Sequence, residues 1–264
     1  TIDKKSKKGE LGIGGGIVWD SDPLHEFQEA KLKAKFVTEP ETYFELIETM
    51  LVEKGEIFLL DYHIRRLKES VDHFLFYFDE ESILNKMSGS IQGLDINSKY
   101  RLRLLLSKWG EIKIDISELS FNQENPKAVI SNKKINSQNK YQFFKTTNRA
   151  LYDEEYNSYK DEFTDIIFLN ENGNIAEGVI TNIIIRIGEK YYTPPIEDGI
   201  LNGCYREYLL NSRDDINIKS FGINELLASE ELILINSVRK EIKISELHKD
   251  GVMIKRFLNN EFDF

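Results

Sequence analysis

The sequence predicts a mixed α/β (α+β) fold in two domains. Short apolar runs bounded by turn signals predict strands, and longer segments with apolar residues at the 3.6-residue period predict helices. A polar stretch at residues 121–127, which contains Pro126, separates an earlier from a later group of these elements. The length of 264 residues is sufficient for two modest domains, each with an apolar core.

Composition excludes several classes of protein. A net charge of -10 argues against a nucleic-acid partner, because binding a phosphate backbone requires a basic surface. No run approaches the roughly 18 apolar residues of a membrane span, and the charged N-terminus lacks the apolar core of a signal peptide. Cys204 is the single cysteine, so no intrachain disulfide can form. We therefore expect a cytoplasmic protein that acts on a small molecule.

Residues 1–40 are expected to form a separate segment that ends in a linker closed by Pro40. The first ten residues are charged and predict a solvated arm. The glycine cluster that follows is no dinucleotide site, because Ile17 replaces the last glycine of G-x-G-x-x-G. Ser21 or Asp22 should cap a helix that has Pro23 in its first turn.

The first domain is predicted at residues 41–120. Residues 46–60 contain two apolar runs around Lys54-Gly55, which is a hairpin signal. Asp61 is expected to cap a helix, and residues 79–98 read as a second helix and a polar loop. The first helix has one apolar stripe, made of Ile64, Leu67, Val71, Phe74, Leu75 and Phe78.

Two strands are expected around Lys108–Gly110. Arg101 and Arg103 share one face of the first of them, because side chains alternate along a strand. They are either surface charges on an edge strand or, in the case of Arg103, part of a site.

The second domain is predicted at residues 128–264. Lys145 is expected to open a helix, and Glu177 should lie near the start of a strand that follows the strand DIIFLN and a tight turn. Another helix is expected to begin near Gly203, where backbone N–H groups could bind an anion. The segment after that helix alternates strand, short helix, strand, turn and strand.

The spacing of these residues resembles one enzyme family. The motifs are His63-x-x-Arg66-Leu67, Lys145, Glu177-Gly-x-x-Thr181-Asn182 and Leu201-x-Gly203-x-x-Arg206. Together they resemble the fold-type IV pyridoxal phosphate (PLP) enzymes over roughly residues 43–250. That family includes branched-chain and D-amino acid aminotransferases and 4-amino-4-deoxychorismate lyase. The resemblance implies two α/β domains with PLP between them, and a homodimer.

The resemblance also implies a role for each matched residue. Lys145 would be the catalytic amine that binds PLP covalently, and this role requires a lysine whose pKa is lowered. Glu177 would keep the pyridine nitrogen protonated. The phosphate would be held by Arg66, the Thr181 hydroxyl, and the backbone N–H groups of Cys204 and Tyr205. The remaining cofactor-binding residues would be Asn182, Leu201, which packs on the ring, and Gly203, which allows close approach.

Substrate carboxylates are expected to meet Arg103 and a loop that contains Ser237 and Arg239. The loop resembles the family's N-S-x-R-G. Here Lys240 replaces the glycine, which puts the backbone geometry of the loop in question. The four histidines show no metal-ligand spacing, so no metal is expected.

A second resemblance covers residues 12–36. The pattern from Gly14 to Ala34, which includes Asp20-Ser-Asp-Pro23, is similar to the C-terminal end of chorismate-binding enzymes such as aminodeoxychorismate synthase large subunits. With only this end of such a domain, no synthase activity is expected from it. The missing domain implies possible association with a glutamine amidotransferase.

The sequence is compatible with three functions. The chorismate-type segment favours a lyase that converts 4-amino-4-deoxychorismate to p-aminobenzoate and pyruvate in folate biosynthesis. D-amino acid aminotransferases carry an Arg-x-His after the strand turn near Gly110. This sequence lacks that motif, which also favours the lyase. A PLP-dependent branched-chain or D-amino acid aminotransferase is the alternative, and an inactive fragment that acts as an interaction module is the third.

Overall fold

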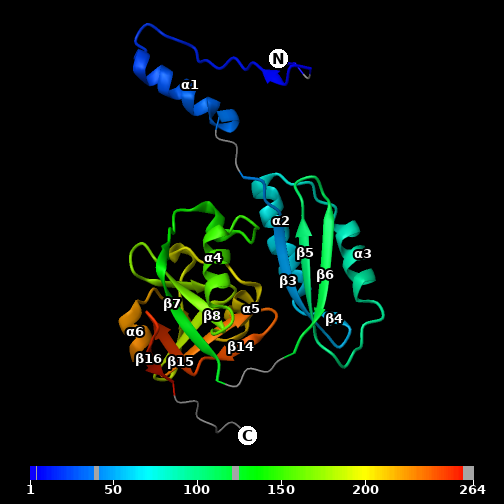
Figure 1. Cartoon of the computed structure of the whole chain (residues 1–264), viewed down its shortest axis with the longest axis vertical. Coiled ribbons are helices and arrows are strands. Elements are labelled where there is room, and N and C mark those ends of the chain that lie inside the picture. The colour runs from blue at the N-terminus through cyan, green and yellow to red at the C-terminus, as the bar shows by residue number, and fades with distance from the viewer. Residues whose placement is uncertain (4, 39–41, 121–124, 258–264) are drawn as a thin grey trace. The chain divides into compact units, whose positions relative to one another are not determined.

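The computed structural model describes residues 1–3, 5–38, 42–120 and 125–257. Its contacts divide the chain into two units, Thr1–Tyr43 and the chain from Phe44 onward (Figure 1). Pro40 and most of the expected linker at 121–127 lie outside the described residues. Among the described residues, no helix combines the length and the apolar character needed to cross a membrane.

The first unit contains a short hairpin, β1 (Ile2–Asp3) and β2 (Lys8–Gly9), and the helix α1 (Pro23–Thr38). The predicted start of α1 is confirmed, because Asp22 Oδ1 accepts a hydrogen bond from the backbone N–H of Leu24 at 3.1 Å. The resemblance to chorismate-binding enzymes also implies a strand before α1, and this expectation is wrong. Residues 10–18 pair with no strand in the described chain, and a strand needs a neighbouring edge for its N–H and C=O groups.

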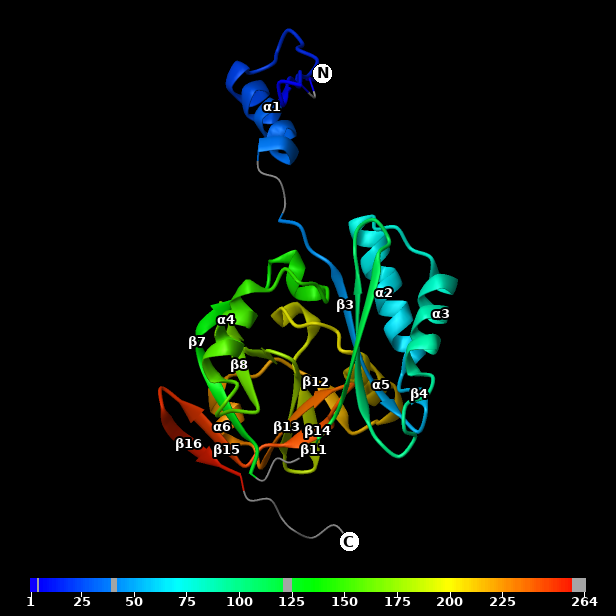
Figure 2. The ribbon, with the colours of Figure 1, turned by 45° about the vertical axis from the view of Figure 1, so that its right-hand side comes forward.

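The second unit begins with a four-stranded antiparallel sheet in the order β4-β3-β5-β6, and two helices cover one face of it (Figure 2). The predicted hairpin is confirmed: Lys54 and Gly55 adopt positive φ of 54° and 78° between β3 and β4. The elements are β3 (Leu46–Glu53), β4 (Glu56–Ile57), α2 (Leu60–Phe74), α3 (Glu80–Ile91), β5 (Tyr100–Leu106) and β6 (Ile112–Glu118).

The boundaries of α2 differ from the prediction. Asp61 lies in the first turn and does not cap the helix, because Leu59 precedes it in a left-handed conformation with φ 56°. The helix ends at Phe74, and Leu75 is 79% exposed, so it does not belong to the buried stripe. The rest of the stripe packs onto β5 through Ile64, Leu67, Val71, Phe74, Leu102 and Leu104.

The second half of this unit contains two five-stranded sheets, ordered β12-β11-β10-β13-β14 and β16-β15-β7-β8-β9. Its strands are β7 (Lys127–Ile135), β8 (Asp165–Asn170), β9 (Ile175–Gly178), β10 (Asn182–Ile187), β11 (Lys190–Thr193), β12 (Ile216–Ile218), β13 (Glu231–Asn236), β14 (Lys240–Lys243), β15 (Glu246–Lys249) and β16 (Val252–Arg256). Its helices are η1 (Lys140–Phe143), α4 (Ala150–Tyr159), η2 (Ile196–Asp198), α5 (Cys204–Ser212) and α6 (Ile223–Ala228).

Apolar side chains of the two five-stranded sheets face each other and form the core of this half, with Ile167 from one sheet and Ile183 and Leu234 from the other. A second cluster covers the outer side of β8 with Tyr152 from α4. A third covers the outer side of β10 and β13 with Leu209 from α5. This packing holds α4 and α5 rigidly on opposite sheets.

Two further expectations are corrected. Lys145 does not open a helix, because the chain is extended there and the Lys145 carbonyl accepts a hydrogen bond from the Ile47 backbone N–H at 2.8 Å. The helix starts only at Ala150, after Thr146 and Thr147, whose β-branched side chains disfavour helix. β5 is not an edge strand, since it lies between β3 and β6.

Candidate active site

A cavity of about 700 Å³ opens between the four-stranded sheet and the second half of the unit. Its volume is in the usual range for small-molecule sites. The structure brings together at this cavity all twelve residues that the sequence analysis singled out: Arg66, Arg103, Lys145, Glu177, Thr181, Asn182, Leu201, Gly203, Cys204, Tyr205, Ser237 and Arg239.

Lys145 reaches the cavity from the extended segment that bonds to β3. Burial lowers the pKa of its amine, and the positive charges of Arg66 and Arg149 lower it further, to about 8. A substantial fraction of the amine is therefore neutral near pH 8, and a neutral amine is a nucleophile and a proton acceptor. The structure gives Lys145 the property that its expected role requires.

Glu177 lies on β9 and lines the same cavity. Its Oε2 accepts a hydrogen bond from the Leu201 backbone N–H at 2.9 Å, and its Oε1 contacts the Tyr152 hydroxyl at 2.8 Å. Burial raises the pKa of this carboxyl to about 7, although these two donors and the nearby Arg149 and Lys145 favour its ionised form. A carboxylate held this firmly can bind a protonated ring nitrogen placed in the cavity.

The start of α5 provides backbone donors. Gly203 is the N-cap, and the helix begins at Cys204, so the first N–H groups of the helix have no partner within it. A Cβ on Gly203 would lie 2.1 Å from Asn182 Oδ1. Asn182 cannot easily move, because its Nδ2 donates to the Leu201 carbonyl at 2.8 Å. A larger residue at this position would therefore displace Asn182 at the helix start.

Arg66 lies on α2 beside this helix start, and a buried carboxylate holds it. Its Nε and Nη2 donate to the two oxygens of Glu48 on β3, at 2.9 and 2.5 Å. Burial alone would raise the pKa of Glu48, but Arg66 and His63 lower it to about 2. Such a two-point ion pair fixes the plane of the guanidinium group.

Replacing Glu48 by Gln is expected to remove much of the acid-sensitive stability. The Glu48 pKa is depressed below its ordinary 4.5, so its stabilising effect is present above that pH and is lost as pH falls toward 2. The shift corresponds to roughly 3 kcal/mol at pH 7. Urea unfolding between pH 3 and 7 should show lower stability at pH 7 and a flatter pH dependence for Glu48→Gln.

The matched control for that experiment is Glu207→Gln. Glu207 pairs with Arg65 at 2.7 Å, but both side chains are partly exposed, so the change should cost less than about 1 kcal/mol. An unchanged pH slope in Glu48→Gln would contradict the stabilising ion pair.

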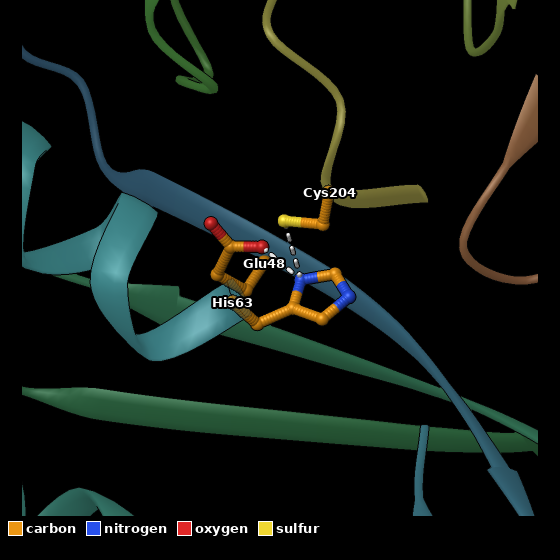
Figure 3. A group of neighbouring side chains, drawn as sticks. All are labelled: Glu48, His63 and Cys204. Atoms are coloured by element: carbon orange, nitrogen blue, oxygen red, sulfur yellow. Dashed lines mark hydrogen bonds and ion pairs between the residues drawn. The ribbon is translucent and has the colours of Figure 1, made fainter. Parts of the chain in front are cut away.

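Glu48 also belongs to a buried group with His63 and Cys204 (Figure 3). His63 Nδ1 lies 2.6 Å from Glu48 Oε2 and 3.5 Å from Cys204 Sγ. The sequence showed no histidine near Cys204, and the fold supplies one. The thiol is nevertheless a poor nucleophile, because burial raises its pKa to about 12. The Glu48 oxygens already bind Arg66, and the positive charge of Arg66 disfavours a metal cation beside it. The expectation that the protein binds no metal stays a prediction.

Thr181 differs in detail from its expected role. Its hydroxyl donates to Asp165 Oδ2 at 2.7 Å, so its proton points to the protein and not toward an anion in the cavity. Asp165 is fully buried and also accepts from the Ile180 backbone N–H at 3.1 Å. Asp165 thereby fixes the turn that carries Thr181.

Part of the cavity lining is basic. Arg101 and Arg103 project from β5, and the loop after β13 contributes Ser237 and Arg239. Among the described residues, Nη1 of Arg239 is buried without a hydrogen-bond partner. An unpaired buried donor costs free energy, so a ligand carboxylate is a suitable partner for Arg239.

Sequence reasoning did not find Glu48, Tyr152 or Asp165. A usable signal existed for the two acids, because Glu48 interrupts the apolar strand LIETMLV and Asp165 begins the apolar strand DIIFLN. A charged residue in such a strand is costly to bury without a partner. Tyr152 had no such signal, since a tyrosine on an amphipathic helix is ordinarily a core residue.

The fold is that of a known class of proteins. Residues 45–247 match the family model of amino-transferase class IV, and the chain belongs to this family. Residues 1–39 match the model of chorismate binding enzymes.

Among its relatives is "Putative aminodeoxychorismate lyase" of Schizosaccharomyces pombe. It is 30% identical over 75% of this chain and 87% of that protein. "Aminodeoxychorismate lyase" of Bacillus subtilis is 26% identical over 77% of this chain and 78% of its own. A solved structure titled putative amino-acid aminotransferase, from Mesorhizobium loti, superposes with a TM-score of 0.72 at 27% identity and covers 77% of this chain and 99% of that one.

Proposed function

We propose that this chain is a PLP-dependent aminodeoxychorismate lyase. The observation that carries the proposal is that Lys145, with its lowered pKa, lines one cavity with Glu177 and the glycine-capped start of α5. The lyase names of the curated relatives and the chorismate-type segment at residues 1–39 support lyase chemistry in particular.

The residues present fit PLP. The start of α5 and Arg66 would hold its phosphate, and Glu177 would bind its ring nitrogen. Lys145 is the buried amine that would bind the aldehyde of PLP. The observation that tests this fit is the close approach of Gly203 to Asn182. At the start of α5 there is no room for a residue larger than glycine at position 203. When bound, PLP would withdraw electrons from the carbon that carries the substrate's amino group.

The protein's own residues would then move one proton. Lys145 Nζ takes the proton from C4 of 4-amino-4-deoxychorismate and returns it to the methylene carbon of the departing enolpyruvyl group. The products are p-aminobenzoate and pyruvate, so atoms balance without an oxidant or water. Aromatisation of the ring drives the reaction. Arg103 and Arg239 would receive the two substrate carboxylates.

The assay for this function is direct. Purified protein loaded with PLP should convert 4-amino-4-deoxychorismate to p-aminobenzoate, which is followed by its fluorescence. In an aminotransferase the same amine would carry the proton of the substrate's α-carbon. No p-aminobenzoate, together with turnover of a 2-oxo acid and an amino donor, would replace the lyase assignment by an aminotransferase.

Gly203→Ala is expected to weaken PLP binding. The added methyl group must displace the Asn182 side chain, and overpacking of this kind costs about 1–3 kcal/mol. A loss of about 1.4 kcal/mol at the cofactor site corresponds to tenfold weaker binding. Titration of the apoprotein with PLP, followed by absorbance, measures the dissociation constant.

Gly89→Ala is the matched control. Gly89 lies within α3, and a Cβ there would meet nothing within 4 Å. Its PLP affinity should equal that of the wild type, and its helix should be slightly more stable. Equal PLP affinity in the two variants would argue against a phosphate at the start of α5.

A further inference from the structure

Lys240 has an unusual backbone conformation. It follows Arg239 directly and pairs with Asn236 at the end of the β13–β14 hairpin, where the resembling motif has glycine. Its φ is 58°, in the left-handed region that glycine adopts freely and lysine does not. A non-glycine residue persists in this region only when its surroundings compensate for the strain. The contacts of the Lys240 side chain are therefore informative.

The side chain joins two distant parts of the unit. Lys240 Nζ donates to Glu53 Oε1, at the end of β3, at 2.6 Å, and lies 4.5 Å from the centre of the Phe58 ring. Glu53 also pairs with Lys99 at 3.3 Å. The ion pair is partly shielded, with 37% of the Lys240 and 21% of the Glu53 side chain exposed. It connects the four-stranded sheet to the loop that carries Arg239.

The other end of the loop is fixed as well. Asn236 Oδ1 accepts from the backbone N–H groups of Val238 and Arg239, at 3.0 and 2.8 Å. Asn236 Nδ2 donates to the Ile180 carbonyl at 3.3 Å. The backbone of Arg239 thus lies between two attachments, while its side chain lines the cavity with a buried, unpaired Nη1 among the described residues.

We propose that Lys240 is a positioning residue for the substrate: its ion pair with Glu53 holds Arg239 where it receives a substrate carboxylate. This rests on the proposed function, in which the substrate carries two carboxylates. The glycine of the resembling motif can adopt the left-handed backbone conformation of the loop without strain. Lysine at this position adds a contact that glycine cannot make, and accepts backbone strain in exchange.

Three variants separate the backbone effect from the side-chain effect. Lys240→Met keeps the length and the strain but removes the charge, and Glu53 then still has Lys99 as partner. Lys240→Gly removes both the strain and the ion pair, and Lys240→Arg keeps the charge. Lys243→Met is the control, because Lys243 lies on the same strand and pairs with Glu231 at 3.6 Å.

Substrate binding is measured in two ways on the PLP-loaded enzyme. The first is the KM for 4-amino-4-deoxychorismate. The second is calorimetric titration with chorismate, which has the same two carboxylates but no amino group to react. Lys240→Met and Lys240→Gly should each raise the KM and the dissociation constant of chorismate by about 3- to 10-fold. The kcat should stay within about twofold of the wild-type value, and PLP affinity should be unchanged. Lys240→Arg and Lys243→Met should match the wild type.

Loop order is measured independently of any substrate. Hydrogen exchange of the Val238 and Arg239 amides should be faster in Lys240→Met and Lys240→Gly. The thermal midpoint of Lys240→Gly should not fall below that of the wild type, because relief of the left-handed strain offsets the lost ion pair. A merely structural role would instead lower stability, PLP affinity and kcat together.

The outcomes distinguish this proposal from the proposed function. Unchanged exchange, or faster exchange with unchanged KM and chorismate affinity, overturns the positioning role of Lys240, as does a parallel loss of stability, PLP affinity and kcat. Faster exchange with weaker chorismate binding, in a protein without lyase activity, rejects the lyase but retains Lys240 as a positioning residue.

Discussion

Lys145→Ala is expected to abolish lyase activity. In the proposed function the amine would be both the attachment point for PLP and the base that moves the substrate proton, and a positioned base alone contributes about 10²–10⁴-fold. Its lowered pKa of about 8 makes it suited to both roles. The measurements are p-aminobenzoate formation and the visible absorbance of PLP bound to the purified protein, which should shift to that of free aldehyde.

Lys160→Ala is the control for this change. Lys160 is an exposed lysine at the end of α4, away from the cavity lining, so activity and absorbance should remain at wild-type levels. If Lys145→Ala kept the wild-type absorbance and turnover, another amine would be the attachment point and the site assignment would fail.

Glu177→Gln is expected to reduce turnover by roughly 10- to 100-fold while PLP stays bound. Glutamine preserves the size of the side chain but cannot carry the negative charge that favours a protonated ring nitrogen. Loss of a charged hydrogen bond costs about 1.5–3 kcal/mol. Although burial raises the pKa of Glu177 to about 7, a cation placed beside it would lower that pKa and favour the carboxylate.

The matched control is Glu155→Gln. Glu155 is as deeply buried as Glu177, but it bonds to Ser131 and does not line the cavity. Its replacement should affect stability and leave kcat near the wild-type value. Steady-state kinetics and thermal unfolding of both variants provide the comparison. A Glu177→Gln enzyme with full turnover would show that no charge is needed at this position.

Local signals in the sequence predicted most elements well. The turn at Lys54-Gly55, the strand DIIFLN and the helix start at Gly203 each depend on residues adjacent in the chain. Element ends were less predictable. Leu59 adopts a left-handed conformation before α2, and the segment after Lys145 is extended because it bonds to the edge of β3. Neither fact is visible in local propensity, and in the segment after Lys145 tertiary hydrogen bonds decide the conformation.

The resemblance in spacing located residues of the cavity lining but not their partners. Arg66 was expected at the site, whereas its two-point bond to Glu48 requires α2 to fold back on β3. The same holds for Tyr152 beside Glu177 and for Asp165 beside Thr181. Each partner is polar and buried, and its position follows from how sheets and helices pack, which spacing along the chain does not encode.

The sequence by itself determined the family, and it led to the lysine and the acid that we propose for the site, because these depend on residue type and spacing along the chain. Only the tertiary structure decided the electrostatics. The pKa values of Lys145 and Glu177 follow from burial and from charges contributed by separate elements. The contact of the Arg239 loop with the four-stranded sheet is likewise tertiary, because Lys240 Nζ donates to a carboxylate 187 positions away in the chain.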